Sequence, residues 1–317
     1  QRKKLFEMTN QHIKMHDGTL HPIIGFGTYK IGFVPASSNS AAVAGHDPAD
    51  DPKEIIKAAI SAGYRYIDCA QFYGNEHMVG QALAECGVPR SELFIVSKVW
   101  GDKMFEGSEA ICQQLDRTLS DLGTDYLDSY LVHWPVPGKH VAAYQTLEGL
   151  LAAGKVRSIG VSNYTIEDYQ ELAKVAKVKP AINQIEVNPF LYRRNTIDFF
   201  QKEGVVVQSY RTLRQGKEMT HPAIASIAAK HSRTPAQVLI RWCLQKNIVA
   251  VVKSANKARM AENLAVFGWA LSEEDVAALD ALTSPESIQE FKGLYDKCVI
   301  RDTPLRPDVV PKEYTLD

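Results

Sequence analysis

The chain has 317 residues, with 36 Lys and Arg against 37 Asp and Glu and a formal net charge of −1. This balance lacks the basic excess of a dedicated nucleic-acid-binding protein. The longest aliphatic runs, such as Ile248–Val252, are far shorter than the roughly 20 residues of a membrane span. No apolar run follows the basic start at residues 1–5, so we expect no secretory signal. The length allows one large α/β domain or two ordinary domains.

The five cysteines are widely spaced and form no Cys-x-x-Cys motif; they are Cys69, Cys86, Cys112, Cys243 and Cys298. Their odd number and spacing argue against a disulfide framework and a zinc site, and we expect no metal. Reduced thiols that pack as small apolar side chains are typical of a cytosolic protein, so we predict a cytoplasmic location. We expect the glycosylation sequon Asn163-Tyr-Thr165 to be a chance match.

In chain order, the first predicted element is a β-hairpin over residues 11–22, where polar and apolar residues alternate around Asp17-Gly18. Most later segments have helical periodicity, as Lys53–Ala62 and Glu109–Leu122 do. Between them lie eight short β-branched or aliphatic runs that predict strands: Ile24–Thr28, Arg65–Cys69, Phe94–Val99, Asp128–His133, Val156–Val161, Ala181–Ile185, Val205–Ser209 and Ile248–Val252.

The alternation of these strands and helices defines the predicted fold class. Strands that are apolar on both faces indicate a parallel sheet covered on both sides. Eight strand–helix units favour a closed (β/α)8 TIM barrel, with an open doubly wound sheet as the alternative. The whole chain, 1–317, then forms one domain, and the hairpin precedes the first barrel strand, where it could close the bottom of the barrel.

Two segments outside the eight units are also predicted. Residues 34–52 lack periodicity and are rich in Ala, Ser, Asp and Pro, which predicts a long surface loop after the first barrel strand. Ser272-Glu-Glu-Asp275 has the spacing of a capping box and predicts an extra C-terminal helix that carries Val276, Leu279 and Leu282. Residues 285–317 contain several prolines and are predicted to be an irregular tail.

Four chemically active side chains lie at or just beyond the ends of three consecutive predicted strands. They are Asp68 and Tyr73, Lys98, and His133. In a barrel of this kind the carboxyl ends of the strands carry the catalytic groups, and they converge on one face. The four residues therefore predict a proton-transfer site, and the alternative is a buried polar network without turnover.

These residues stand in motifs that resemble the aldo-keto reductase family over nearly the whole chain. The motifs are Gly25-Phe-Gly-Thr28, Asp68-Cys-Ala-Gln-Phe-Tyr-Gly-Asn-Glu76, Val96-Ser-Lys98, Leu131-Val-His133-Trp-Pro135, Gly160-Val-Ser-Asn163, Asn183-Gln-Ile-Glu-Val-Asn-Pro189 and Val252-Lys-Ser254. The resemblance implies a monomeric enzyme that reduces aldehydes and ketones with NADPH. The short segment after His133 resembles the short-loop members, such as prostaglandin F synthase and diketogluconate reductase, and implies an open pocket with broad carbonyl tolerance.

The resemblance gives each of the four residues a role. Tyr73 is expected to donate a proton to the carbonyl oxygen, and Lys98 is expected to lower the pKa of that phenol. Asp68 would hold Lys98 in place and charged, and His133 would bind and orient the carbonyl oxygen. The substrate site is expected to be lined by aromatic side chains, those of Tyr29, Trp100 and Trp134.

The cofactor site also follows from the resemblance. Three polar side chains are expected to bind the nicotinamide carboxamide: Ser162, Asn163 and Gln184. Tyr210 would stack on the nicotinamide ring. Lys253 and Arg259 suit the 2′-phosphate that distinguishes NADPH from NADH, because a dianion favours charge-assisted donors. The remaining expected cofactor residues are Gly27, Thr28, Leu213, Arg214, Ser254, Asn256, Glu262 and Asn263.

Two features depart from the usual family pattern. After Tyr210 the chain continues Arg211-Thr-Leu-Arg214, where many relatives have Ser-Pro-Leu-Gly, so we hypothesise that Arg211 or Arg214 grips the cofactor phosphates. The 34–52 loop is longer than in most relatives, and it either shapes the pocket or is an inert insertion.

Two alternative functions remain at this point. One is an NADPH-binding regulatory or sensing subunit on the same barrel. The other is a metal-dependent hydrolase that uses Asp68 and His133.

Overall fold

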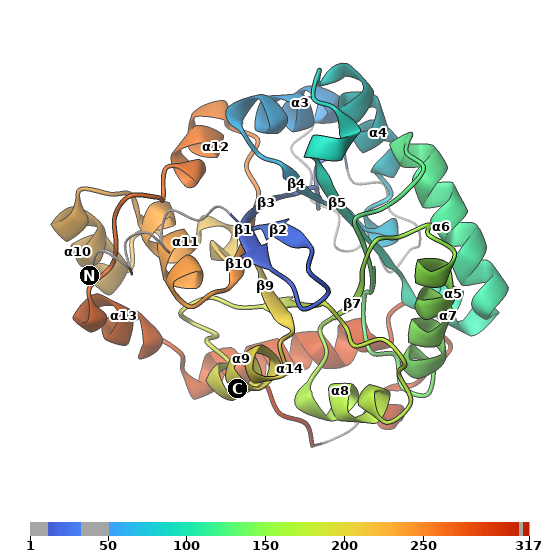
Figure 1. Cartoon of the computed structure of the whole chain (residues 1–317). Helices are drawn as coiled ribbons and strands as arrows, with labels where there is room; N and C mark the ends of the chain where they lie inside the picture. The colour runs from blue at the N-terminus through green and yellow to red at the C-terminus, as the bar shows by residue number, and fades with distance from the viewer. Residues whose placement is uncertain (1–11, 33–50, 311–312, 317) are drawn as a thin grey trace.

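The structure, a computed structural model, describes residues 12–32, 51–310 and 313–316. Eight parallel strands close into a barrel in the order β10-β3-β4-β5-β6-β7-β8-β9 (Figure 1). All their residues are buried except the half-buried Tyr210, as expected for a parallel sheet covered by helices. The predicted TIM barrel is confirmed, and the open-sheet alternative is wrong. The strands are β3 (Ile24–Gly27), β4 (Tyr66–Asp68), β5 (Phe94–Val99), β6 (Ser129–Val132), β7 (Ile159–Ser162), β8 (Ile182–Glu186), β9 (Val206–Tyr210) and β10 (Val249–Val252).

Helices surround the barrel as an outer ring (Figure 1). The first of them in the described chain, α3, begins after the N-cap Asp51, ends at the left-handed Gly63, and buries its apolar face against the barrel. No helix within the described ranges is both long and apolar enough to cross a membrane. The helices are α3 (Pro52–Ala62), α4 (Glu76–Glu85), α5 (Gly101–Glu106), α6 (Ser108–Leu122), α7 (His140–Ala152), α8 (Ile166–Ala173), α9 (Arg194–Lys202), α10 (Pro222–His231), α11 (Pro235–Gln245), α12 (Lys257–Leu264), α13 (Glu273–Asp280) and α14 (Pro285–Val299).

The predicted N-terminal hairpin is present and closes the bottom of the barrel. Strands β1 (His12–Lys14) and β2 (Leu20–Pro22) pair antiparallel, and Gly18 takes a positive φ of 92° in the turn between them. Met15 packs in one buried cluster with Phe94, at the start of β5, and with other side chains of the barrel interior. The hairpin therefore plugs the amino ends of the strands, opposite the face where a (β/α)8 barrel carries its active site.

The C-terminal region matches the expectation only in part. The capping box of Ser272 and Asp275 is formed and opens α13, as predicted. The prediction of an irregular tail is wrong for residues 285–299, which form α14. Its N-cap is Ser284, and Pro285 occupies the first turn. The backbone N–H that proline lacks would have no partner within the helix at this position. Of the predicted 34–52 loop, residues 34–50 lie outside the described part of the chain, and Pro52 is already helical.

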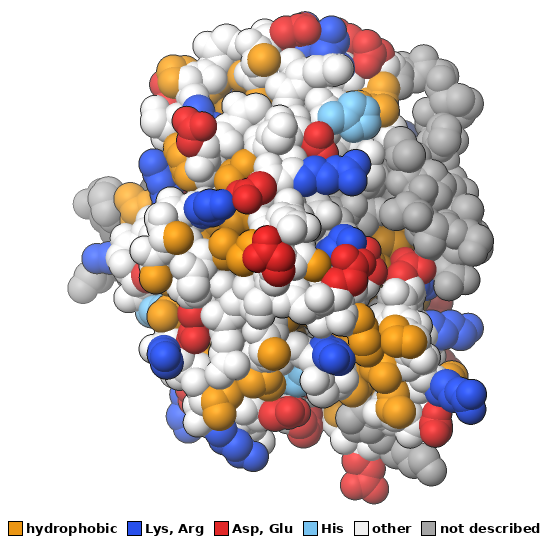
Figure 2. All heavy atoms as spheres, turned by 90° about the vertical axis from the view of Figure 1, so that its right-hand side faces the viewer, with side chains coloured by type: hydrophobic (Ala, Val, Ile, Leu, Met, Phe, Trp, Pro, Cys, Tyr) orange, Lys and Arg blue, Asp and Glu red, His pale blue; other side chains and the backbone are white. Residues whose placement is uncertain are grey.

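Charged residues of both signs are interspersed on the side of the molecule that carries α5, α6 and α7 in Figure 1 (Figure 2). That face shows no extended basic surface, in keeping with the net charge of −1.

Candidate active site

A cavity of about 1300 Å³ opens at the carboxyl ends of the barrel strands. It brings together residues from all eight barrel strands or from the loops that follow them, as the fold predicts for a catalytic face. The predicted site residues that line it are Gly27, Tyr29, Asp68, Tyr73, Trp100, His133, Trp134, Ser162, Asn163, Gln184, Tyr210, Leu213, Lys253, Ser254, Asn256, Arg259, Glu262 and Asn263.

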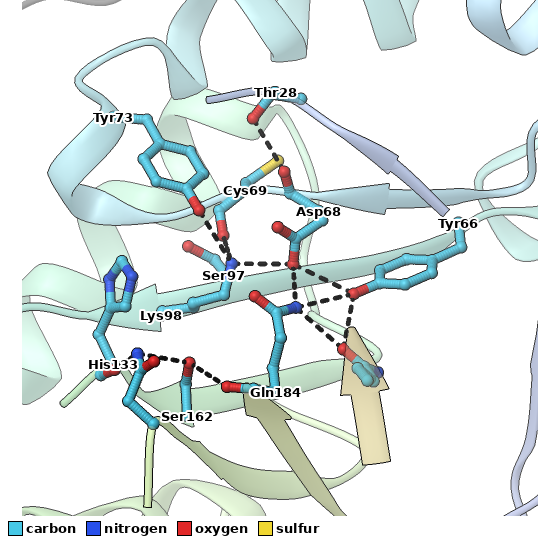
Figure 3. Close-up of polar contacts among 12 residues, drawn as sticks. Thr28, Tyr66, Asp68, Cys69, Tyr73, Ser97, Lys98, His133, Ser162 and Gln184 are labelled. Carbon is cyan, nitrogen blue, oxygen red and sulfur yellow. Dashed lines mark hydrogen bonds and ion pairs between the residues drawn. The ribbon is translucent and has the colours of Figure 1, made fainter. Parts of the chain in front are cut away.

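Lys98 lies beneath the floor of this cavity and is fully buried on β5. Its Nζ lies 2.8 Å from Asp68 Oδ1, 2.8 Å from the Cys69 carbonyl oxygen and 3.4 Å from the Tyr73 hydroxyl (Figure 3). Three oxygens thus receive the three protons of the ammonium, which is how a buried charge is stabilised. The ion pair with Asp68 directs the remaining Lys98 proton at the phenol.

Tyr73 ends the short 3₁₀ helix η1 (Gln71–Tyr73), which Gly74 terminates in a left-handed conformation. Burial raises the pKa of Tyr73 well above that of a free phenol, and the Asp68 carboxylate raises it further. The predicted net lowering of this pKa is wrong, because burial and the Asp68 carboxylate together outweigh the cation of Lys98, which favours the phenolate. The phenol therefore carries its proton at neutral pH and has it available to donate.

His133 follows β6 and faces the same cavity (Figure 3). Its ring centroid lies 6.0 Å from that of Tyr73 and 4.9 Å from that of Trp100, both nearly edge-on. Burial lowers the pKa of His133 well below its usual value, and the positive charge of Lys98 lowers it further. The imidazole is consequently neutral near pH 7, so it suits hydrogen bonding to an oxygen rather than proton donation.

The polar residues beyond His133 form one connected group. Asn163 has a positive φ of 61° and donates from Nδ2 to the His133 carbonyl oxygen at 3.0 Å. The Tyr210 hydroxyl donates to Asn163 Oδ1 at 2.7 Å, and Ser162 Oγ donates to the Gln184 carbonyl oxygen at 2.7 Å. The residues expected at the nicotinamide are therefore brought together and held by one another.

The opposite end of the cavity is formed by the segment after β10 and by the start of α12. Asn256 caps this helix by accepting a hydrogen bond from the Arg259 backbone at 3.0 Å. Lys253 and Arg259 are exposed beside this helix start and line the cavity. Two cations at a helix N-terminus form a suitable site for a phosphate group.

Three predicted residues lie outside the cavity wall. Lys98 acts from below the floor, as described. Thr28 is buried, and its hydroxyl donates to the Asp68 carbonyl oxygen at 2.9 Å, so it supports the strand end. Arg214 turns away from the cavity toward Glu218 and Glu290, at 3.7 and 3.9 Å.

The Arg214 guanidinium is directed at these two carboxylates and lies outside the cavity lining, and its contact with the cofactor phosphates stays a prediction. Arg211, in contrast, lines the cavity and pairs with Glu186 at 3.1 Å.

Sequence reasoning missed a wall of the cavity formed by the C-terminal region. Leu294 and Cys298 from α14, and Arg301 just after it, line the cavity. Phe72, beside Tyr73, completes this wall by stacking on Trp100 with 4.1 Å between ring centroids. The sequence contains a signal for α14, because Leu294 and Cys298 are four residues apart, about one helical turn, although the prolines after Ser284 favour an irregular segment.

The barrel brings Tyr73, the buried Lys98 and His133 together at the carboxyl ends of its strands. The aldo/keto reductase family model matches residues 24–284. The chain belongs to the aldo-keto reductase family. The expected enzyme class, an NADP-dependent oxidoreductase acting on carbonyl groups, is thereby confirmed.

Relatives and solved structures agree with this membership. Glyoxal reductase of Bacillus subtilis is 37% identical over 276 residues, covering 87% of this chain and 94% of that protein. The 9,11-endoperoxide prostaglandin H2 reductase of Trypanosoma cruzi is 34% identical over 279 residues, covering 87% and 93%. The Bombyx mori aldo-keto reductase, solved in complex with NADP, has a TM-score of 0.75 and 30% identity over 86% of this chain and 92% of that one.

Proposed function

We propose that this protein reduces aldehydes and ketones to alcohols with NADPH, and that Tyr73 supplies the proton. The single observation that carries the proposal is the buried Tyr73 hydroxyl that lies 3.4 Å from Lys98 Nζ at the floor of the cavity. In this reaction the carbonyl carbon gains a hydride from NADPH, and the carbonyl oxygen gains a proton from Tyr73.

The chemistry of the lining residues fits NADPH. Amide and hydroxyl groups gather at the catalytic end, and Lys253 and Arg259 lie at the other end beside the start of α12. Ser162, Asn163 and Gln184 would hold the carboxamide, and the two cations would hold the 2′-phosphate. When bound, the dinucleotide supplies the hydride.

The side chains of this chain then control the proton. Tyr73 donates its proton to the carbonyl oxygen, and Lys98 stabilises the phenolate that remains. Asp68 keeps Lys98 in place through the 2.8 Å ion pair. His133 is neutral, so it directs an N–H at the carbonyl oxygen and leaves the proton transfer to Tyr73.

Aromatic rings bound the substrate end, and the Arg301 cation lies beside them. Tyr29, Trp100 and Trp134 line this part of the cavity together with Phe72 and the C-terminal wall. Aromatic walls suit an apolar carbonyl compound. Arg301 adds a positive charge, with its guanidinium carbon 6.0 Å from the Phe72 ring centroid.

The variant Tyr73→Phe tests the proposal. Loss of a general acid lowers kcat by roughly 10²- to 10⁴-fold, whereas the affinity for NADPH should be unchanged, because the ring remains. NADPH oxidation with 4-nitrobenzaldehyde is followed by absorbance, and NADPH binding by quenching of intrinsic fluorescence. Turnover of the variant at the wild-type rate would refute the role of Tyr73. A wild-type protein that binds NADPH but reduces no carbonyl would favour a regulatory subunit instead.

The monomeric state and the cytoplasmic location belong to the same proposal. All five cysteines are free thiols in the structure, which suits a reducing compartment. Sedimentation at micromolar concentration tests the monomer, and a dimer at that concentration would refute it.

A further inference from the structure

A network of hydrogen bonds runs through the barrel interior, below the ion pair of Asp68 and Lys98. Asp68 Oδ1 accepts a hydrogen bond from Gln184 Nε2 at 2.8 Å and lies 3.1 Å from the Tyr66 hydroxyl (Figure 3). Gln208 Oε1 lies 2.9 Å from both of these donors. Gln208 Nε2 lies 2.8 Å from Nε2 of His21, which belongs to the hairpin plug. This hydrogen-bond network thus connects the Asp68 carboxylate with the closed end of the barrel.

The hydrogen bonds of this network have only one consistent direction. His21 Nδ1 lies 2.6 Å from the Pro22 carbonyl oxygen, which can only accept, so Nδ1 carries the ring proton. Burial lowers the pKa of His21 to about 3, so the ring is neutral and its Nε2 accepts. Gln208 must therefore direct its amide N–H2 at His21 and its carbonyl oxygen at Tyr66 and Gln184.

This direction determines how the Gln184 side chain lies. Both of its N–H groups have an acceptor inside the barrel, one on Asp68 and one on Gln208. A flipped amide would place its oxygen 2.8 Å from the Asp68 oxygen and 2.9 Å from the Gln208 oxygen, two contacts between acceptors. Gln184 lines the cavity, and its hydrogen bonds within the described chain leave Oε1 unused.

We infer that His21, Gln208 and Tyr66 are positioning residues that fix the Gln184 amide with its oxygen facing the cavity, as the acceptor for the amide N–H2 of the nicotinamide carboxamide. The inference rests on the proposed NADPH-dependent function. It assigns the hairpin a part in cofactor binding as well as in closing the barrel.

The backbone at Gly25 provides the space for this hydrogen-bond network. A Cβ on Gly25 would lie 2.2 Å from the Tyr66 ring, so only glycine at this point of β3 admits a tyrosine in the barrel interior. The Tyr66 ring also packs edge-on against the His21 ring, with 4.7 Å between centroids. Tyr66 is consequently held at both its ring and its hydroxyl.

Two ligands separate positioning from general damage to the fold. NADPH reaches both ends of the cavity, whereas 2′,5′-ADP carries the 2′-phosphate but has no nicotinamide. The variant Gln208→Met keeps the length of the side chain and removes its hydrogen bonds. Loss of one such bond, about 1–1.5 kcal/mol, corresponds to about a 5- to 13-fold increase in the dissociation constant of NADPH. The dissociation constant of 2′,5′-ADP should not change.

Tyr66→Phe is the second variant, because it deletes one hydroxyl and preserves the ring that fills the barrel; it should weaken NADPH binding in the same direction. Gln114→Met is the matched control. Gln114 is a buried glutamine on α6 that bonds Thr118 at 3.3 Å, so neither ligand should bind differently to this variant.

Unchanged NADPH binding in both Gln208→Met and Tyr66→Phe would overturn the inference, and so would equal weakening of NADPH and 2′,5′-ADP. Neither result would touch the proposed function, which is measured by the wild-type protein. If the wild-type protein binds neither ligand, the proposed function itself fails, and this inference with it.

Discussion

Replacement of Lys98 by methionine is the perturbation that the buried ion pair makes most informative. Lys98 is fully buried, the Asp68 side chain is 4% exposed, and their charged atoms lie 2.8 Å apart. Removing one partner of a buried pair typically costs about 3–5 kcal/mol, because the other charge is left uncompensated. Asp68 keeps its bonds from Gln184 and Tyr66, so we expect the lower end of this range.

The same substitution should remove activity by a separate route. Lys98 Nζ is 3.4 Å from the Tyr73 hydroxyl, so its loss leaves the phenolate formed on proton donation without a nearby cation. We expect kcat for carbonyl reduction to fall by about 10²-fold or more. Urea unfolding followed by tryptophan fluorescence measures stability, and NADPH oxidation under saturating cofactor measures kcat.

The double variant Asp68→Asn, Lys98→Met separates the two effects. An asparagine carries no charge, so the double variant should regain most of the lost stability. Its kcat should stay as low as that of the single variant, because Tyr73 still has no cation beside it. A single variant as stable as the wild type would refute the reasoning about the buried pair. Recovery of activity in the double variant would refute the role of Lys98 at Tyr73.

Three further predictions concern the cofactor, the pH dependence and the substrate. Arg259→Met should raise the KM for NADPH by about 10-fold or more, the value of a charge-assisted hydrogen bond, and leave the KM for NADH unchanged; equal changes for both cofactors would contradict a phosphate contact. Reduction needs protonated Tyr73, whose pKa is raised well above 10.0. The rate should therefore stay constant from about pH 7 to about pH 10 and fall only at higher pH, while alcohol oxidation, which needs the phenolate, should rise with pH. A reduction rate that rises with pH would contradict this sign. Arg301→Met should raise the KM for 4-carboxybenzaldehyde by about 5-fold or more and leave that for benzaldehyde unchanged, since the Arg301 cation lines the cavity; an equal effect on both aldehydes would show that Arg301 only shapes the wall.

Local sequence was enough to locate most secondary structure, and the exceptions have a physical cause. Lys53–Ala62 was predicted as a helix because its isoleucines repeat at helical spacing, and the same spacing buries them in α3. The same signal exists in α14, but Pro285 by itself predicts a break in the helix. Proline disrupts a helix interior and is tolerated in the first turn, so its meaning depends on where the helix begins.

The pKa of Tyr73 shows a different limit. The sequence placed a lysine at the end of one strand and a tyrosine beyond another, which suggested that the cation lowers the pKa of the phenol. The net sign of the pKa shift also depends on burial and on the Asp68 carboxylate, which pairs with Lys98. Burial and Asp68 both raise the pKa of Tyr73. Such a balance is a property of distances in space, which sequence spacing does not contain.

By itself, the sequence determined the barrel, the family and the four residues Asp68, Tyr73, Lys98 and His133, because periodicity and motif order are local and repeat along the chain. Only the tertiary structure decided that Arg211 lines the cavity while Arg214 turns to two glutamates. It alone brought residue 21 of the hairpin to residue 208 of β9, through a hydrogen bond across 187 positions. Closure of the barrel creates that contact, and no pattern in either segment records it.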